Sequence, residues 1–374
     1  MRIRGVVLER TNGPLTVSEL ELDAPGPEEA LVRLGASGVC HSDYNAVDGT
    51  AETRCPAVLG HEGAGVVEAV GERVTRVRVG DRVALSWTPA CGTCSECIRD
   101  LPQLCSTVWP AMATGGLMDG TPRLSREGEP VYHYSFLSTF ADACVVPERS
   151  CVPIPEDVPF EVAALVGCAV ATGTGSVWRT AGVRPGDRVA VVGCGGVGVS
   201  ALMAAVAVGA DPVVAVDTAP AKLEVARSFG ATETVMWAGS AEDTAEAIRE
   251  ASDGGVDYAI EATGRPEAML AAFLSTRARG AAVLIGIPRQ DAVLSLPAST
   301  IPRMERRVLG SIYGSSKPER DFPRILDLYR AGRLPLDRII SHRLALEDVE
   351  RGFELMHSGE ALRVVLDLST QGRP

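Results

Sequence analysis

The sequence VAVVGCGGVGVSALMAAVAVGA, residues 189–210, is uncharged from end to end. On length alone this run could cross a bilayer. Glycines at positions 193, 195, 196 and 198 divide it, however, into a short β-branched run and a longer Ala-rich run. This division is typical of a buried strand that turns directly into a helix. We therefore predict a strand-turn-helix unit in the interior of a parallel sheet.

Strand-like and helix-like runs alternate from about residue 170 onward. RVAVVG is followed by VSALMAAVAV, PVVAVD by AKLEVARSFG, and VDYAIEATG by EAMLAAFLSTRA, with AAVLIGIP closing the series. This alternation predicts a doubly wound parallel sheet in an α/β domain. Residues 1–150 instead alternate short β-branched runs with Gly- and Pro-containing turns, which predicts a mainly β domain. After about residue 312, a helical stretch and a last strand resemble the mixed pattern of the first domain. We therefore expect the C-terminal segment to rejoin that domain.

Length, charge and cysteine content narrow the class of protein. A chain of 374 residues favours about two domains. The 48 acidic residues outnumber the 36 basic ones, and a net charge of −12 works against nucleic acid or an anionic membrane as a partner. The start, MRIRGVVLERTNG, holds too few apolar residues for a signal peptide, so we expect a cytoplasmic protein. Ten cysteines in such a chain favour metal binding over disulfides.

The glycine turn formed by Gly193, Gly195, Gly196 and Gly198 follows a predicted strand and opens a predicted helix. Such a turn lets the backbone approach a pyrophosphate closely. Asp217 ends the next strand-like run, where a carboxylate would accept hydrogen bonds from the adenosine ribose hydroxyls. The negative charge of Asp217 would repel the 2′-phosphate of NADP, so we predict NAD rather than NADP. The alternative is a plain glycine turn with a helix-capping aspartate.

Four cysteines recur at short spacing within one loop: Cys91, Cys94, Cys97 and Cys105. Four thiolates complete the tetrahedral shell of zinc and leave no open position, so they predict a structural zinc site. A bacterial ferredoxin motif is the near alternative. That motif has a shorter last gap and a proline after the last cysteine, where this chain has Ser106.

A second set of metal-ligand residues is scattered, with Cys40 in VCHSD, His61 in LGHEGAG and Cys168 in VGCAVATG. Two thiolates and one imidazole leave a fourth zinc position open for water or an alcohol oxygen, which is the composition of a catalytic site. Sequence spacing alone does not bring these three together. The other cysteines are expected to pack in the interior as small apolar side chains, namely Cys55, Cys144, Cys151 and Cys194.

GHEGAGVV, the four-cysteine lobe, GCAVATG and the glycine turn together resemble the zinc-dependent medium-chain alcohol dehydrogenases, nearly from end to end. MDGTPRLSREGEPVYHYSFLSTFADACVV resembles the longer loop of the branch that contains the class III enzymes. The resemblance implies a GroES-like catalytic domain at 1–169 and 313–374, with a structural zinc lobe at 91–105, and a Rossmann domain at 170–312. It also implies an active site in the cleft between the domains, NAD, one catalytic and one structural zinc ion per chain, a small-molecule alcohol or aldehyde and a homodimer.

The resemblance also implies roles for single residues. The catalytic zinc ligands would be Cys40, His61 and Cys168, with Asp43 and Glu62 supporting them. Ser42 matches the hydroxyl that takes the alcohol proton. The residues implied to contact the cofactor, besides the four glycines and Asp217, are His41, Thr172, Val197, Lys222, Ile287 and Arg363. The residues implied to line the substrate pocket are Trp87, Tyr134, Phe140, Ile287 and Ile312.

The pocket residues are mostly aromatic or aliphatic, so we expect an apolar substrate, aromatic or allylic. Each assignment has a plainer alternative: Ser42 could cap a helix, Asp43 could be a first-turn charge, Arg363 could be an exposed strand residue and Phe140 could pack in the core. Where many relatives have a histidine that passes the proton to solvent, this chain has Asn45, which does not titrate. Either water or His41 completes the path, or the enzyme works mainly as a carbonyl reductase.

Three other functions remain open at this point. A thiol-dependent formaldehyde dehydrogenase of the same branch would require a thiol cofactor. A non-catalytic protein would keep the zinc and NAD sites for binding alone, and a quinone-type reductase of this fold would need no zinc. The intact set Cys40, His61, Cys168, Ser42 and Asp217 argues against the non-catalytic protein, and its zinc ligands argue against the zinc-free reductase.

Overall fold

A computed structural model describes residues 1–369 of the chain, which divides into two compact units. Unit 1 comprises Met1–Cys168 and the segment that begins at Lys317, and unit 2 comprises Ala169–Ser316. Each unit has its own sheet structure and is described by itself. The functional boundaries expected from the sequence, at 169/170 and 312/313, stay a prediction.

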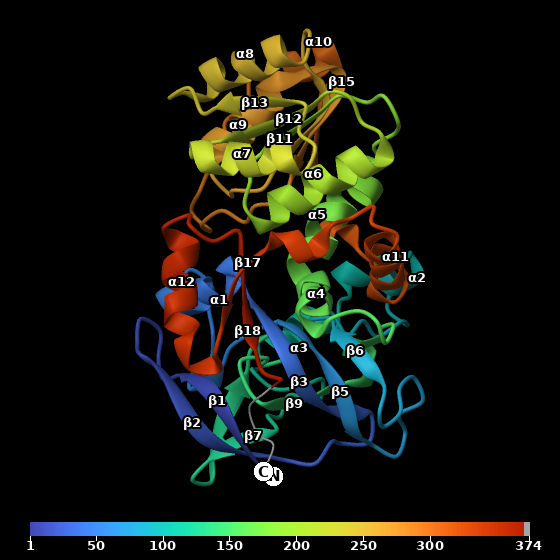
Figure 1. Cartoon of the computed structure of the whole chain (residues 1–374), viewed down its shortest axis with the longest axis vertical. Helices are drawn as coiled ribbons and strands as arrows, with labels where there is room; N and C mark the ends of the chain where they lie inside the picture. Colours follow the sequence, from blue (N-terminus) through green and yellow to red (C-terminus); the bar gives the residue numbers. More distant parts are fainter. Residues whose placement is uncertain (370–374) are drawn as a thin grey trace. The chain divides into compact units, whose positions relative to one another are not determined.

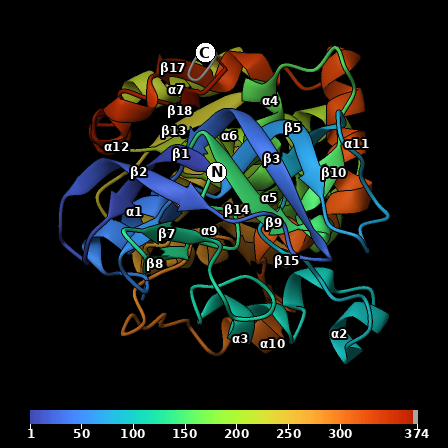
Figure 2. The same cartoon turned by 90° about the horizontal axis from the view of Figure 1, so that it is seen from below.

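Unit 1 contains a closed barrel and a larger sheet. The barrel strands, in order, are β1 (Arg2–Leu8), β2 (Leu15–Leu22), β7 (Leu124–Arg126), β8 (Glu129–His133) and β4 (Ala57–Val58). Seen from below, β2, β7 and β8 lie side by side in that order (Figure 2). The larger sheet runs in the order β10 (Cys151–Pro153), β6 (Arg82–Leu85), β5 (Glu62–Val70), β3 (Glu29–Val39), β18 (Arg363–Asp367) and β17 (Ile340–Leu344), with β9 (Ala143–Pro147) also pairing with β3.

The C-terminal segment is built into the sheet of unit 1. Strand β18 pairs antiparallel with β3, so Val364 lies opposite Val39 (red against blue in Figure 1). This pairing brings residues near position 363 next to residues near position 40. The helices of unit 1 are α1 (His41–Asp48), α2 (Ser95–Ile98), α3 (Val108–Met112), α4 (Phe160–Leu165), α11 (Pro318–Arg330) and α12 (Val349–His357).

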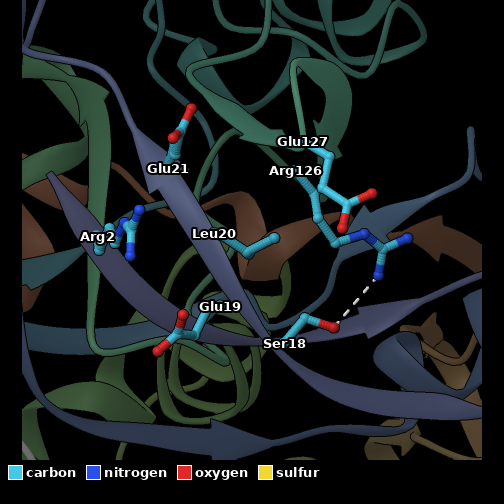
Figure 3. Close-up of a pocket in the computed structure, with 7 residues that line it drawn as sticks. All are labelled: Arg2, Ser18, Glu19, Leu20, Glu21, Arg126 and Glu127. Atoms are coloured by element: carbon cyan, nitrogen blue, oxygen red, sulfur yellow. Dashed lines mark hydrogen bonds between the residues drawn. The ribbon is translucent and has the colours of Figure 1, made fainter.

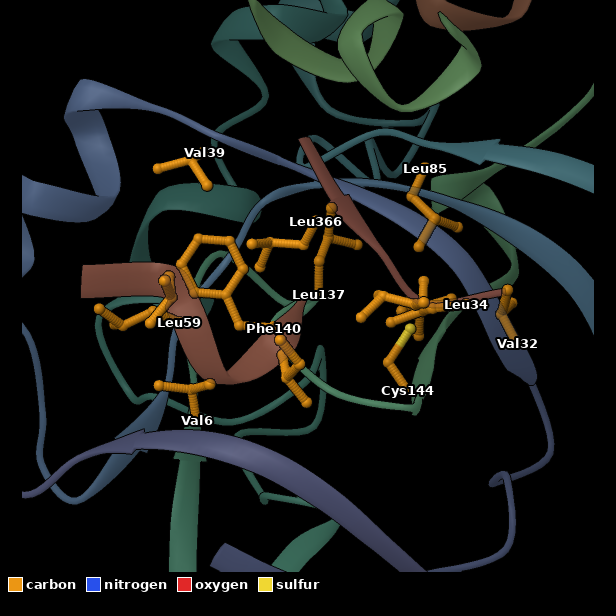
Figure 4. Close-up of a cluster of buried hydrophobic side chains, with 14 of the residues drawn as sticks. Val6, Val32, Leu34, Val39, Leu59, Leu85, Leu137, Phe140, Cys144 and Leu366 are labelled. Carbon is orange, nitrogen blue, oxygen red and sulfur yellow. The ribbon is translucent and has the colours of Figure 1, made fainter. Parts of the chain in front are cut away.

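A continuous apolar core holds the large sheet of unit 1 together. Figure 4 shows the ring of Phe140 among the side chains of Val6, Leu59 and Leu137. Phe140 is completely buried, and its ring lies 6.4 Å from that of Phe353 in α12. The core therefore fixes α12 against the strands that lead into α1.

Unit 2 is a parallel sheet with the strand order β13 (Glu233–Met236), β12 (Val213–Asp217), β11 (Val189–Val192), β14 (Val256–Glu261), β15 (Thr276–Leu284) and β16 (Arg307–Gly310). Its helices are α5 (Ala171–Gly175), α6 (Gly196–Val208), α7 (Pro220–Ser228), α8 (Ala241–Ala251), α9 (Pro266–Ser275) and α10 (Thr300–Met304). The order reverses between β11 and β14, as in doubly wound sheets. The predicted α/β fold class, a mainly β domain plus a doubly wound parallel sheet, is confirmed.

The apolar stretch 189–210 is the strand β11 followed directly by the helix α6, as its glycines predicted. Among residues 1–369, one helical stretch, Phe160–Ala181, is long and apolar enough to cross a membrane by length and composition alone. Of its most apolar window, 83% is buried inside the protein, as expected for a core helix. This stretch widens into π-helical turns at Val166–Val170 and Ser176–Ala181, and π-turns within helices often occur at functional sites.

Candidate active site

The first turn of α1 begins where the central strand β3 ends. Cys40 caps this helix with extended backbone and is nearly buried, and its N–H donates to Asp43 Oδ2 at 3.0 Å. This bond satisfies an amide at the helix start that would otherwise lack a partner. It also fixes the Asp43 carboxylate, which is fully buried, beside Cys40. Asp43 is therefore more than a first-turn surface charge.

Asp43 also holds the imidazole of His61. Its Oδ1 lies 2.7 Å from His61 Nδ1 and accepts the Gly60 N–H at 3.2 Å. With Nδ1 occupied by the carboxylate, Nε2 is left as the ligand atom of the ring, the usual arrangement at zinc sites. Burial lowers the pKa of His61, but the charges of Asp43 and Cys40 outweigh it and raise that pKa well above its ordinary value.

The scattered ligand residues converge on one point within unit 1. Side-chain atoms of Cys40, His61, Glu62 and Cys168 all lie within 4.8 Å of one another. Cys168 comes from the π-helical turn Val166–Val170. A hydrogen bond from Cys168 holds the pKa of the Cys40 thiol well below its usual value despite burial. Two sulfurs and one imidazole around a shared centre fit zinc with an open position.

Glu62 completes this cluster and is paired with Arg363. Both side chains are buried, at 0% and 6% exposure, and Arg363 Nη2 donates to Glu62 Oε2. Burial raises the pKa of Glu62 to about 7, while the guanidinium opposes that rise. A Cβ on Gly38 would meet Glu62 Oε2 at 2.0 Å, so the glycine makes room for this carboxylate. Arg363 is thus not the exposed strand residue of the plainer alternative, and its contact with a cofactor pyrophosphate stays a prediction.

Ser42 lies next to Cys40 and is half-buried, with its Oγ 3.9 Å from Cys40 Sγ. Its backbone carbonyl accepts a hydrogen bond of 2.6 Å from the hydroxyl of Tyr134. The ring of Tyr134 lies edge-on to His61 at 5.8 Å between centroids. The sequence indicated Tyr134 as a pocket wall only, and no local pattern could indicate this long-range bond.

The exposed His41, the first residue of α1, belongs to an imidazole pair that sequence reasoning missed. His41 lies edge-on to His357 of α12 at 5.5 Å, and His357 lies 4.0 Å from the ring of Tyr44. Burial and the nearby His41 lower the pKa of His357. Asn45, at the usual position of the relay histidine, is half-buried on the same helix. Sequence spacing could not indicate this pair, because His41 and His357 come together only when β18 pairs with β3.

The four-cysteine loop also closes on itself. The sulfurs of Cys91, Cys94, Cys97 and Cys105 lie within 4.8 Å of one another. Backbone amides point at these sulfurs, with Cys94 N at 3.3 Å from Cys91 Sγ and Cys91 N at 3.4 Å from Cys105 Sγ. Hydrogen bonds from Thr93 lower the pKa of Cys91 to about 5. Thiolates held by amide donors fit a tetrahedral zinc site.

In unit 2, the glycine turn after β11 has the geometry of a dinucleotide loop. Gly193 has a φ of +95°, and a Cβ on Gly198 would meet Gly193 O at 1.8 Å, so side chains are excluded at both positions. Asp217 accepts the Cys194 N–H at 2.8 Å and the Ala219 N–H at 3.0 Å. This carboxylate therefore ties the turn to the end of β12.

The other predicted cofactor and pocket residues lie in different settings. Thr172 is nearly buried, Val197, Lys222 and Ile312 are half-buried, and Ile287 is 70% exposed, all in unit 2. Trp87 of unit 1 is half-buried, with its ring edge-on to that of Trp109 at 6.0 Å.

Phe140 packs in the core of unit 1 and has no exposed surface, which supports the core-packing alternative. Its contact with substrate and the other assignments stay predictions.

A surface pocket of about 430 Å³ lies on the barrel strands of unit 1 (Figure 3). It is lined by Arg2, Ser18, Glu19, Leu20, Glu21, Arg126 and Glu127. Arg126 donates to Ser18 Oγ at 3.2 Å and to Glu9, so its charge is already paired. None of the predicted site residues lines this pocket.

Comparisons with known proteins agree with this geometry. The alcohol dehydrogenase GroES-like domain matches residues 26–156, and the zinc-binding dehydrogenase domain matches residues 196–331. A curated alcohol dehydrogenase class-3 from Myxine glutinosa is 36% identical over 358 residues, which is 95% of each chain. The chain belongs to the zinc-dependent medium-chain alcohol dehydrogenases. As a member of this family it is an oxidoreductase, and its cofactors are a nicotinamide dinucleotide and zinc.

Solved structures of alcohol dehydrogenases support the same assignment. An alcohol dehydrogenase zinc-binding domain protein from Burkholderia ambifaria is 33% identical, with a TM-score of 0.94 over 98% of this chain and 99% of that one. A benzyl alcohol dehydrogenase from Acinetobacter calcoaceticus is 30% identical, with a TM-score of 0.93 over 98% and 99% of the two chains. The resemblance drawn from GHEGAGVV and the cysteine lobe is therefore confirmed at the level of the family.

Proposed function

We propose that this zinc alcohol dehydrogenase interconverts apolar, aromatic or allylic primary alcohols and their aldehydes, with Cys40, His61 and Cys168 as ligands of the catalytic zinc. The observation that carries the proposal is the convergence of these three side chains from separate segments within 4.8 Å. The buried Asp43 behind His61 is a second support, because a ligating imidazole needs an orienting acceptor.

The residues of the chain transfer the proton, orient the zinc ligand and balance the buried charge. Zinc supplies a Lewis acid that stabilises negative charge on the substrate oxygen, and NAD supplies the hydride acceptor. The Ser42 hydroxyl takes the proton of the alcohol and returns one in the reverse direction. Asp43 keeps the ligating nitrogen of His61 pointed at the cluster. Arg363 offsets the charge of Glu62, so that the buried carboxylate is tolerated beside the thiolates.

The proton leaves Ser42 by a route other than residue 45. Asn45 has no group that titrates near neutral pH. The exposed His41, paired edge-on with His357, or a water molecule carries the proton to solvent.

An apolar substrate is favoured by the aromatic ring at the site. The ring of Tyr134 stands beside His61 at 5.8 Å, and Trp87, edge-on to Trp109 at 6.0 Å, is proposed as a further wall. Flat aromatic walls of this kind accept an aromatic or allylic group well. The benzyl alcohol dehydrogenase among the similar structures points in the same direction. Ile287 and Ile312 are proposed to add aliphatic surface.

A thiol-dependent formaldehyde dehydrogenase is the second candidate, favoured by the 36% identity to a class-3 relative. The deciding experiment measures NADH formation by the zinc-replete protein with benzyl, cinnamyl and allylic alcohols, with and without a low-molecular-weight thiol. Turnover without thiol supports the proposal. Turnover of formaldehyde only with thiol would move the assignment to the second candidate. No turnover in either direction, with NADH binding intact, would support a binding protein.

We also propose NAD over NADP, a homodimer and a cytoplasmic location. The Asp217 carboxylate at the end of β12 would repel a 2′-phosphate, so NADPH should bind more weakly than NADH in a fluorescence titration. Strand β16 ends the sheet of unit 2, and its Val308 is 40% exposed, which suits pairing with a second copy. Light scattering of the purified protein gives the mass that tests the dimer.

A further inference from the structure

The segment between β8 and β9, residues 134–142, is hydrogen-bonded to the first turn of α1. The hydroxyl of Tyr134 donates to the carbonyl of Ser42 at 2.6 Å, across 92 residues of sequence. This carbonyl belongs to the peptide unit that joins Ser42 to Asp43. A shift of that peptide would move the Ser42 side chain and with it the hydroxyl.

Tyr134 is itself held by a buried polar chain. Its N–H donates to Ser138 Oγ at 3.3 Å, and Ser138 Oγ lies 3.1 Å from His133 Nδ1. His133 Nε2 accepts the N–H of Arg123 at 3.0 Å. Ser138 and His133 are both buried, at 0% and 4% exposure. The backbone at Tyr134 is therefore held in place by these buried hydrogen bonds.

The backbone of this loop is also tightly constrained. Ser135, Phe136 and Ser138 all have positive φ, at 51°, 63° and 53°, which side-chain-bearing residues rarely adopt. Such a conformation persists only where the surroundings hold it in place, and the buried ring of Phe136 supplies such a hold. Because this segment is held in place, the Tyr134 hydroxyl can hold the Ser42 carbonyl in a defined position.

The direction of the hydrogen bond limits what Tyr134 can do for a substrate. A phenol hydroxyl has a single hydrogen, and here it is donated to the Ser42 carbonyl. The hydroxyl is therefore not available as a proton donor to an aldehyde oxygen. The ring, edge-on to His61 at 5.8 Å, remains as apolar surface.

We propose that Tyr134 is a positioning residue for the Ser42 hydroxyl and acts through its hydrogen bond to the Ser42 carbonyl, in addition to forming pocket surface with its ring. The inference rests on the proposed role of Ser42. Pre-organised groups lose rate steeply when they are displaced by small distances. Loss of the hydrogen bond should therefore lower the rate of the step in which Ser42 takes part, with little change in the affinity for alcohol.

The test is a double-mutant cycle on single-turnover hydride transfer from a benzyl alcohol, using Tyr134→Phe, Ser42→Ala and both together. Tyr134→Phe should lower the rate about two- to tenfold, the range expected for loss of one hydrogen bond. In the Ser42→Ala background the same change should have no further effect. The matched control is Tyr132→Phe, in strand β8 two residues before Tyr134, whose ring packs under Arg54 at 4.3 Å.

A second readout needs no turnover. Amide hydrogen exchange in α1 of the zinc-replete protein, without cofactor, should become faster in Tyr134→Phe and stay unchanged in Tyr132→Phe. Equal rate losses from Tyr134→Phe with and without the Ser42 hydroxyl would overturn the inference, as would unchanged exchange in α1. If Ser42→Ala itself leaves the rate unchanged, the proposed role of Ser42 fails first, and that result is distinct from a failure of Tyr134 alone.

Discussion

The Glu62 carboxylate and the Arg363 guanidinium form a buried pair although 301 residues separate them in sequence. The pair exists because β18 lies next to β3 in the large sheet of unit 1, while Glu62 begins β5 on the other side of β3. It places a compensated charge beside the cluster of Cys40, His61 and Cys168. A buried charge that loses its partner is costly, so this pair should be visible in stability measurements.

Replacement of Arg363 by leucine should lower the free energy of unfolding by about 3–5 kcal/mol, because Glu62 then remains buried without its partner. Urea denaturation monitored by fluorescence measures this change. The matched control is Arg343→Leu. The Arg343 side chain is 51% exposed in its ion pair with Glu161, so its loss should cost less than about 1 kcal/mol. An equal cost for the two variants would show that burial does not set the strength of the Glu62 pair.

Replacement of Asp43 by asparagine should weaken zinc binding at the catalytic cluster about 10- to 100-fold, because the ring of His61 loses its charged acceptor. Zinc content after dialysis against a graded chelator series measures the affinity. The four-cysteine site should retain its metal in the same sample. Asp48→Asn, at the exposed end of the same helix, is the control and should bind zinc like the parent. Loss of both metals together would contradict separate roles for the two sites.

Replacement of Cys105 by serine should release the structural zinc and lower the thermal midpoint by roughly 10 °C or more, since metal binding and folding of the lobe are linked. Calorimetry together with metal analysis checks both effects. Cys55→Ser, outside both clusters, should change neither. If the Cys105 variant kept full stability without zinc, the loop would be held by its own packing rather than by the metal.

Introduction of histidine at position 45 tests whether proton release limits the reaction. Asn45→His should raise the rate of alcohol oxidation near neutral pH, because an imidazole on α1 can exchange protons with solvent. The rate of aldehyde reduction gives the comparison within the same protein. If oxidation does not rise, water or His41 already carries the proton fast enough.

His133 predicts a dependence of stability on acid pH. Burial, with a further contribution from Arg123, lowers the pKa of His133 from 6.5 to about 3 in the folded protein. Between these values the unfolded chain binds a proton that the folded protein does not, so stability should fall as the pH drops from 6.5 toward 3. Urea titrations of His133→Gln should show a shallower decline than those of the parent. The control His342→Gln, nearer the surface, should leave the decline unchanged.

Patterns among residues close in sequence were enough to predict the strand-turn-helix unit and the four-cysteine site. The glycines of 189–210 fixed a strand-turn-helix unit because a strand, a tight turn and a helix are neighbours in sequence. The spacing of Cys91, Cys94, Cys97 and Cys105 indicated one metal site because a short loop can bring only nearby thiols together. Residue spacing was insufficient for Cys40, His61 and Cys168, and the family resemblance supplied their grouping.

The sequence by itself therefore determined the fold class, the family resemblance and the four-cysteine ligand set, while the grouping of Cys40, His61 and Cys168 came from the resemblance and was seen as one cluster only in the structure. Only the tertiary structure decided that Arg363 is buried against Glu62, that Tyr134 bonds to the Ser42 carbonyl, that His357 stands beside His41 and that Phe140 packs in the core. The physical reason is that these contacts join segments far apart in sequence; Arg363, for example, reaches Glu62 because β18 pairs with β3. Strand pairing between distant segments is set by the packing of the whole sheet and leaves no signal in residue spacing.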